Sequence, residues 1–153
     1  DYIDKKYEPL SVVQAVETCK ELVKIFVKHN IDVIRVGLQN TDEISEPGTG
    51  NSEVVAGPYH PAFRQLVESS LWYDAIVNKI KTLNAKVKEV EITVNPIDVN
   101  NVIGHKKENI LKLKNVYEVD LIVKQDDKIR QGKSEIKVTK KYNDFLEDKT
   151  IKI

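Results

Sequence analysis

Three stretches of this chain contain side chains that could bind a ligand or take part in catalysis. The first, residues 35–42, covers the end of an apolar run over residues 31–38 and the polar residues after it, and it contains Arg35, Gly37 and Gln39. These three positions share one face of an extended segment, because side chains alternate along it. An arginine in an apolar run is costly unless it meets an anion or an acceptor, and a glycine there permits close approach of the backbone. The pattern indicates either a ligand-binding wall or a salt bridge from Arg35 to a local acid.

The second stretch, residues 55–64, is rich in glycine, proline and aromatic side chains. Tyr59 and His60 directly precede a predicted helix, and helix N-termini favour anions. A histidine ordinarily titrates near neutral pH, and Arg64 lies about one turn into the same helix. The segment predicts a binding place for a substrate carboxylate or phosphate, or else a rigid loop in which His60 caps the helix and Tyr59 packs.

The third stretch, residues 102–110, lies between two short predicted helices and contains Gly104, Lys106 and Lys107. Its place in a strand-helix-helix-strand-strand order matches the minimal KH fold, whose Gly-x-x-Gly loop clamps about four single-stranded nucleotides. Gly104 stands at the first glycine of that loop and Lys107 at the second. The two lysines add charge, which supplies the non-specific part of nucleic-acid affinity. The alternative is a KH-like fold that serves packing alone, with solvated lysines.

The remaining sequence contains no complete active site. His29, His60 and His105 each lack a second histidine, cysteine or carboxylate at metal-ligand spacing, and no nucleophile elbow or Walker loop occurs. Cys19, the single cysteine, excludes an internal disulfide, a cysteine-ligated zinc site and a self-contained iron–sulfur site. We therefore expect no catalytic residue and no metal ligand in the chain, and we expect Cys19 to be a buried, unreactive thiol.

Composition and charge describe a globular chain with two unlike halves. The chain has 153 residues, of which 41% are hydrophobic and 31% charged, as is typical of folded domains. No apolar run approaches the ~18 residues of a membrane helix, so we expect no membrane contact and a cytoplasmic location. Residues 1–78 carry 7 basic and 12 acidic side chains, whereas residues 79–153 carry 17 basic and 12 acidic ones. This asymmetry predicts two parts with different partners.

The first two stretches must be positioned by a helix, a strand and a second helix. Ser11 and Gln14 form a predicted capping box, after which apolar residues recur at helical spacing. Residues 31–38 are rich in β-branched side chains and predict a strand that is buried on both faces. A long loop over residues 44–60 leads to Pro61, which suits the first turn of the next helix. Helix, tight loop and apolar strand are typical of a parallel α/β sheet.

The third stretch is positioned by a second, smaller set of elements. Residues 89–94 alternate, so that Val90, Ile92 and Val94 are predicted to point inward. The elements predicted after them are helices over residues 97–103 and 107–116, strands over residues 119–124 and 135–139, and a loosely docked segment or edge strand over residues 140–153.

Four motifs together resemble a known family. The most specific is Ala-Gly-Pro-Tyr-His-Pro-Ala-Phe at residues 56–63. The others are Tyr-Glu-Pro-Leu-Ser at residues 7–11, Val-Ile-Arg-Val-Gly-Leu-Gln at residues 33–39 and Val-Ile-Gly-His-Lys-Lys at residues 102–107. The sequence resembles the C-terminal half of bacterial radical S-adenosylmethionine (SAM) proteins related to the elongator catalytic subunit, and the resemblance spans nearly the whole chain.

The resemblance implies an α/β part followed by an α+β part. Residues 1–45 would form the C-terminal end of a partial radical SAM barrel, residues 46–84 a connecting loop and helix, and residues 85–153 a KH-like β-α-α-β-β accessory domain. The intact protein would hold S-adenosylmethionine and a 4Fe-4S cluster, the latter on a cysteine-rich loop outside this chain. With one cysteine and no methionine, the chain is expected to be a fragment that binds neither group, is inactive alone and has the missing N-terminal half as its partner.

The same resemblance implies roles for the three stretches. The chain would form the substrate-facing end of the barrel and an accessory domain that holds transfer RNA (tRNA). The alternatives are an enzyme for a small molecule, as in relatives of oxygen-independent coproporphyrinogen oxidases, a stand-alone module for single-stranded RNA, and a domain that only packs or oligomerises. The expected cofactor-side residues are Arg35, Gly37 and Gln39, the expected substrate-side residues are Thr41, Asp42, Tyr59, His60 and Arg64, and the expected RNA-contacting residues are Gly104, His105, Lys106, Lys107 and Asn109.

Overall fold

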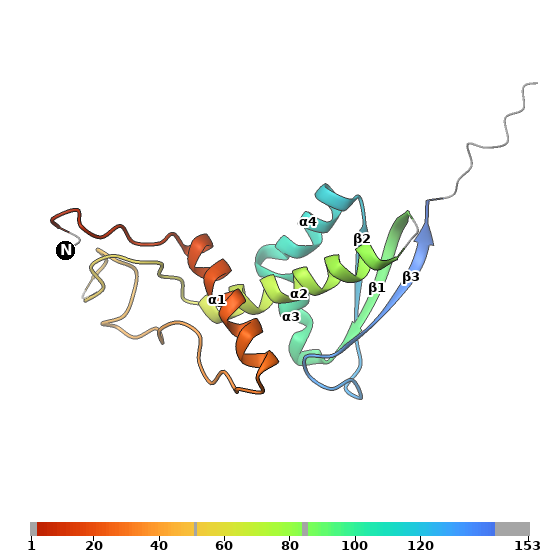
Figure 1. The fold of residues 1–153 in the computed structure, drawn as a ribbon, viewed down its shortest axis with the longest axis horizontal. Helices are drawn as coiled ribbons and strands as arrows, with labels where there is room; N and C mark the ends of the chain where they lie inside the picture. The colour runs from red at the N-terminus through yellow and green to blue at the C-terminus, as the bar shows by residue number, and fades with distance from the viewer. Residues whose placement is uncertain (1–2, 51, 84–85, 143–153) are drawn as a thin grey trace, which may run out of the picture. The chain divides into compact units, whose positions relative to one another are not determined.

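The computed structural model describes residues 3–50, 52–83 and 86–142 of the chain. It divides into two compact units, which we call unit 1 (Asp1–Tyr73) and unit 2 (Asp74–Ile153), and each is described by itself. Among the described helices none is long and apolar enough to cross a membrane. The division groups the connecting loop and the first half of the second helix with the N-terminal part of the chain (Figure 1).

Unit 1 begins with helix α1 (Val12–Lys28), and the predicted capping box at its start is confirmed. The Gln14 backbone N–H donates to Ser11 Oγ at 3.2 Å, and the Ser11 N–H donates to Gln14 Oε1 at 2.8 Å. At the other end the His29 N–H bonds to the carbonyl of Ile25, and Asn30 then takes a positive φ of 56°. Both ends of the helix are therefore closed by local contacts.

The second helix, α2 (Phe63–Thr82), is continuous and spans the boundary between the units. Its first half belongs to unit 1, where Phe63 and Val67 are buried against Ala15 and Val16 of α1. The apolar residues of α1 and α2 thus meet as their helical spacing predicts. This small core holds the start of α2, and with it the loop that precedes the helix.

The predicted strand over residues 31–38 is wrong. These residues run in an extended path, but no strand is assigned to them and they have no strand partner among the described residues. The side chains of Ile34 and Leu38 are 91% and 72% exposed, so the segment is also not buried on both faces. The physical reason is that a strand is defined by its ladder of hydrogen bonds to a neighbour, and the described part of unit 1 offers no neighbouring strand.

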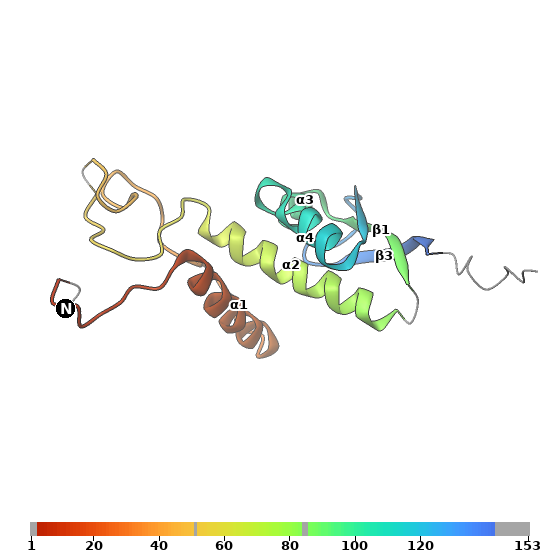
Figure 2. The ribbon, with the colours of Figure 1, turned by 90° about the horizontal axis from the view of Figure 1, so that it is seen from above.

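Unit 2 is a three-stranded sheet with helices on one face, and its predicted order of elements is confirmed. The strand order is β2-β1-β3, with β1 parallel to β2 and antiparallel to β3. Helix α4 packs against β2 (Figure 1). From above, the second half of α2 lies on the same side of the sheet as α3 and α4 (Figure 2). The element bounds are β1 (Val87–Val94), η1 (Pro96–Asp98), α3 (Val99–Ile103), η2 (His105–Lys107), α4 (Glu108–Tyr117), β2 (Asp120–Gln125) and β3 (Ser134–Lys141).

The alternation predicted for the first strand is confirmed by its burial. Val90, Ile92 and Val94 are fully buried, whereas the alternate residues Glu89, Glu91 and Thr93 are only partly buried. The inward side chains form the core of unit 2 with apolar residues of the helices, including Val102, Leu113 and Ile76. This core fixes the position of the loop between α3 and α4.

Two partly buried hydrogen bonds hold the turn between β2 and β3. The Asp98 carboxylate, 4% exposed, accepts from the Gly132 N–H at 2.7 Å, and Asn95 Nδ2 donates to the Ile129 carbonyl at 2.8 Å. Buried polar groups of this kind are stable because they are hydrogen-bonded. Of the segment predicted over residues 140–153, residues 140 and 141 belong to β3, and residues 143–153 lie outside the described part of the chain.

Candidate functional site

In unit 1 the extended segment after α1 is held against the start of α2 by Gly37. Gly37 has a φ of +79°, and a Cβ at this position would lie 2.9 Å from Phe63 Cδ1. Only a glycine combines that backbone conformation with such a close approach. The sequence predicted a close approach at this residue, and the structure shows that it is the approach of Phe63.

Arg64 also holds the same segment. Its Nη1 donates to the Ile34 carbonyl at 3.2 Å, and its Nε lies 2.7 Å from Glu68 Oε1. These contacts give Arg64 a structural task, since it ties α2 to the extended segment. It was predicted to face the substrate, and it is not among the residues that line the cavities described below.

A cavity of about 290 Å³ lies between α1, the extended segment and the loop before α2. Gly37, Tyr59 and His60 line it, so the structure brings together three of the predicted site residues. His60 Nδ1 accepts from the Ala62 N–H at 3.1 Å, so this ring also closes the turn that begins α2. The remaining lining residues are mostly apolar: Ala15, Cys19, Leu38, Val54, Ala56, Gly57, Pro58 and Phe63.

Next to this cavity lies a polar depression of about 600 Å³. Tyr59 lines both, and its hydroxyl donates to Asn40 Oδ1 at 2.5 Å. Thr41 closes a local turn, because its Oγ1 accepts from the Ile44 N–H at 3.0 Å. The depression is lined by Asn40, Thr41, Asp42, Ser45, Thr49, Gly50 and Tyr59. The pair of cavities can hold a ligand with an apolar part and a hydrogen-bonding part.

Two of the three predicted cofactor-side residues contact each other rather than the cavity. Arg35 Nη2 lies 3.4 Å from Gln39 Oε1, and both side chains are exposed. Sequence reasoning missed Cys19 and Asn40 as residues of the site. Cys19 was placed on the apolar face of its helix, which predicts burial but not a cavity, and the partner of Asn40 is Tyr59, which is 19 residues away.

In unit 2 the loop that begins at Gly104 has an unusual backbone. Gly104 has a φ of +83°, and a Cβ there would lie 2.9 Å from the backbone nitrogen of Asn109. Lys106 and Lys107 also have positive φ values, 50° and 64°. Two consecutive non-glycine residues in this region are rare and carry strain of about 1 kcal/mol or more each. Lys107 therefore adopts the left-handed conformation that a glycine would favour.

The five residues predicted to contact RNA fall into two groups. Lys106 and Lys107 are exposed, whereas the two residues before them in the loop are less accessible, His105 being half-buried and Gly104 buried. Asn109 is 4% exposed, and its Nδ2 donates to the carbonyl groups of Asn101 and Val102. Because this amide closes the end of α3, Asn109 positions the loop and is not exposed for contact with RNA.

Hydrogen bonds shift the pKa values of two ionisable side chains in unit 2. Hydrogen bonds from Lys140 and Thr139 lower the pKa of Glu89, and a hydrogen bond to Asp120 raises the pKa of Lys114. Both shifts favour the charged form. Glu89 and Lys114 are therefore each held in a pair with an oppositely charged side chain.

The chain does not itself provide ligands for an iron–sulfur cluster. Within the residues that the structure describes, no three His, Cys, Asp or Glu side chains are grouped so that they could hold a metal ion. The whole sequence has a single cysteine, Cys19, and cysteine thiolates are what hold such clusters.

Comparison with known proteins adds one match. Residues 1–73 match the family described as the Radical_SAM C-terminal domain. This range is slightly less than half of the 153 residues, and it ends at the residue where unit 1 ends. Searches of curated proteins and of solved structures gave no significant match. The match supports a relation of unit 1 to radical SAM proteins, and unit 2 lies outside the matched range.

Proposed function

We propose that this chain is the C-terminal part of a radical SAM enzyme, in which unit 1 borders the substrate site and unit 2 holds tRNA. The observation that carries the first part is the family match over residues 1–73 together with the state of the extended segment inside that range. The segment has the composition of a buried strand but no strand partner. A neighbouring strand from the N-terminal half would supply that partner.

The exposure of the segment supports this reading. Ile34 and Leu38 are mostly exposed, and apolar side chains gain free energy when a partner removes them from water. Its backbone groups also need hydrogen-bond acceptors and donors once they leave water. The position of Gly37, Tyr59 and His60 on one cavity would then place unit 1 at the substrate side of the completed barrel.

The proposed cofactors are S-adenosylmethionine and a 4Fe-4S cluster. Because this chain has one cysteine, the cluster ligands would come from the N-terminal half, and the residues of this chain do not fit the cluster. What this chain would supply is the wall of the substrate site.

The test compares the chain with the protein extended by the N-terminal radical SAM half. After anaerobic reconstitution with iron and sulfide, the extended protein should contain iron and, once reduced, cleave S-adenosylmethionine, and the chain alone should do neither. Cys19→Ser in the extended protein is the matched control, and it should retain iron because Cys19 lies outside the proposed ligand set. An extended protein that binds iron but cleaves no S-adenosylmethionine when reduced would contradict the proposal.

A specific observation also favours tRNA as the partner of unit 2. Lys106 and Lys107 are exposed and held in left-handed conformations beside Gly104, and strained backbone often serves a site. A Lys106→Asp/Lys107→Asp double variant should lose salt-sensitive tRNA binding in fluorescence anisotropy at two salt concentrations. Absence of binding in both proteins would favour a small-molecule substrate and leave unit 2 as a packing domain.

A further inference from the structure

We infer that unit 2 has a second RNA-binding surface, at the end of its sheet that lies away from Gly104. This inference rests on the proposed function in one respect, which is that RNA is the partner of unit 2. The loop at Gly104 precedes α4, whereas the second surface lies where α4 ends, about 15 Å further along the helix. We call it the tyrosine–lysine surface, and it consists of Lys81, Lys86, Lys88, Tyr117, Lys141 and Tyr142.

The fold brings these residues together although they are far apart in the sequence. Helix α2 ends at Thr82, β1 starts at Val87, α4 ends at Tyr117 and β3 ends at Lys141. Figure 1 shows that β1 starts and β3 ends at the same end of the sheet. Val87 pairs with Lys141 in the sheet, and the Tyr142 N–H donates to the Lys86 carbonyl at 2.9 Å.

Each tyrosine ring lies next to an ammonium group. Lys81 Nζ is 5.9 Å from the centre of the Tyr117 ring, and Lys88 Nζ is 5.8 Å from the centre of the Tyr142 ring. Both distances fall within the range of cation–π contacts. The Tyr142 hydroxyl donates to the carbonyl of Glu118 at 3.1 Å, which fixes this ring beside the end of α4. The Tyr142 ring is thus held by its hydroxyl and is still 38% exposed.

The pairing of β1 with β3 is irregular at the same place. The register shifts between Val87 and Glu89 and again between Glu89 and Val90. Such bulges change the direction of nearby side chains and are common beside functional sites. The irregularity therefore lies at the point where Lys88 and Lys141 leave the regular alternation of the sheet.

Glu118, which follows Tyr117, is an exposed acid next to the surface, and two other acids at this end of the sheet pair with lysines outside the surface. Glu89 bonds to Lys140 at 2.6 Å, and Asp120 bonds to Lys114 at 2.7 Å, so both carboxylates already have partners. Among the described residues, none of Lys81, Lys86, Lys88 and Lys141 forms an ion pair. All four lysines are exposed within the part of the chain that the structure describes.

Single-stranded RNA is the partner that fits this combination. Proteins that bind single strands combine cations that follow the phosphates with aromatic rings on which bases stack. An anionic membrane would also attract the lysines, but a surface that lies in a membrane interface buries a broad apolar face, which these six residues do not form. The tyrosine–lysine surface offers both groups, and we assign it to an unpaired segment of RNA.

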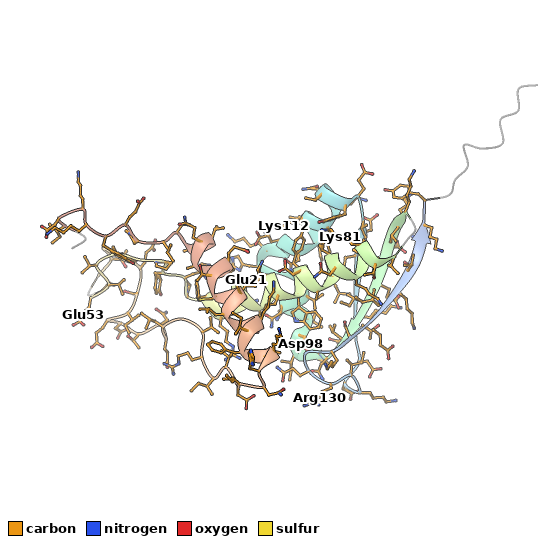
Figure 3. The ribbon with its side chains drawn as sticks, in the orientation of Figure 1. Glu21, Glu53, Lys81, Asp98, Lys112 and Arg130 are labelled. Atoms are coloured by element: carbon orange, nitrogen blue, oxygen red, sulfur yellow. The ribbon has the colours of Figure 1, made fainter. Side chains whose placement is uncertain are left out.

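The test measures anisotropy of a labelled single-stranded RNA with the full chain over a range of salt concentrations. The variant Lys81→Gln/Lys86→Gln/Lys88→Gln/Lys141→Gln should weaken binding at least about tenfold and reduce the salt slope by about 2 to 3. The matched control removes four positive charges from the turn before β3 and from β3 itself, with Lys128→Gln, Arg130→Gln, Lys133→Gln and Lys137→Gln. Figure 3 labels Lys81 and Arg130 at well-separated places in unit 2. The control should change affinity by less than about threefold.

Two substitutions at Tyr142 separate a binding role from a structural one. Tyr142→Leu should weaken binding about five- to tenfold and leave the salt slope unchanged, because it removes a stacking surface and no charge. Tyr142→Phe removes the hydrogen bond to Glu118 but keeps the ring, and it should bind as the wild type does. Equal losses in both variants would mean that the hydroxyl contact is structural and would overturn the role of the ring.

The remaining outcomes distinguish this surface from the proposed function. No RNA binding by the wild type would overturn both. Loss in the Lys106→Asp/Lys107→Asp variant alone would overturn the tyrosine–lysine surface and leave the proposed function standing. Equal losses of RNA affinity in the four-lysine variant and its control would show that binding depends only on the total charge, and would overturn the tyrosine–lysine surface. Binding to vesicles of phosphatidylcholine and phosphatidylserine in place of RNA would identify the partner as a membrane.

Discussion

Gly37 and Gly48 have almost the same backbone conformation but different surroundings, and together they separate two costs of replacing a glycine. Their φ values are +79° and +78°. A Cβ on Gly37 would lie 2.9 Å from Phe63 Cδ1, whereas a Cβ on Gly48 would meet nothing within 4 Å. An alanine would therefore meet the same backbone strain at both positions, but it would clash with Phe63 only at position 37.

The first prediction concerns Gly37→Ala. Gly48→Ala should lower the free energy of unfolding by about 1 kcal/mol, the cost of a left-handed alanine. Gly37→Ala should lower it by about 1 to 3 kcal/mol more, because Phe63 and the start of α2 must move. Urea denaturation followed by circular dichroism measures both. Equal losses in the two variants would mean that Phe63 adjusts freely and that Gly37 does not hold the cavity.

The second prediction is a pH dependence at Glu89. Hydrogen bonds from Lys140 and Thr139 lower the pKa of this carboxyl in the folded state. A lowered pKa gives stability that is present above the unfolded-state value and is lost as the pH falls through the folded-state value. Glu89→Gln should therefore lower the urea midpoint at about pH 7 and lower it less at about pH 3, because the contribution of the ionised carboxylate shrinks as the pH falls below the unfolded-state pKa.

Glu135→Gln is the control for Glu89, because Glu135 is an exposed acid on β3. It should change the midpoint by the same small amount at both pH values. A loss for Glu89→Gln that persists unchanged in acid would show that packing, and not the ionised carboxylate, is what the glutamine disturbs.

At the scale of elements, the start of α1 gives a third prediction. Ser11→Ala removes the acceptor of the Gln14 N–H and should cost about 1 kcal/mol of stability. Thr18→Ala is the matched control, since the Thr18 hydroxyl donates to the Gln14 carbonyl inside the helix. That bond competes with the helix, so its loss should be neutral or slightly stabilising in the same denaturation experiment. A larger loss for Thr18→Ala would contradict the capping argument.

The elements that could be predicted from the sequence are those fixed by local contacts. Ser11 and Gln14 cap a helix three residues apart, and the burial of Val90, Ile92 and Val94 follows from simple alternation. The strand over residues 31–38 could not be predicted correctly. Its apolar composition describes a segment that would be buried, but pairing depends on a neighbour that the described part of unit 1 does not contain.

Less of the candidate site than of the fold could be predicted, because its contacts join residues that are far apart in the sequence. The motif at residues 56–63 indicated Tyr59 and His60, which do line the cavity with Gly37. The contact of Tyr59 with Asn40, and the meeting of Lys88 with Tyr142, depend on the path of the chain and on a register shift. Periodicity and composition carry no information about either.

At the scale of the whole molecule, charge is divided between the two units. Unit 1 carries 7 basic and 11 acidic side chains, and unit 2 carries 17 basic and 13 acidic ones. A long-range attraction for a polyanion therefore comes from unit 2, and unit 1 repels it. This division is what the proposed function requires, in which RNA binds to unit 2.

The fourth prediction tests what the extended segment does in the longer protein. Ile34→Asp should change the stability of this chain by less than about 0.5 kcal/mol, because the side chain is 91% exposed. In the protein extended by the radical SAM half, the same change should cost about 2 kcal/mol or more, since a carboxylate would be buried beside a new strand. Urea denaturation of both proteins, with and without the substitution, measures the difference.

Ile97→Asp is the control for Ile34→Asp, because Ile97 is 67% exposed in unit 2 and lies outside the matched range. It should be tolerated equally in the short and the extended protein. If Ile34→Asp is tolerated in both as well, the segment stays exposed in the longer protein and does not complete a barrel. The family match would then describe unit 1 without giving the extended segment its place beside the substrate site.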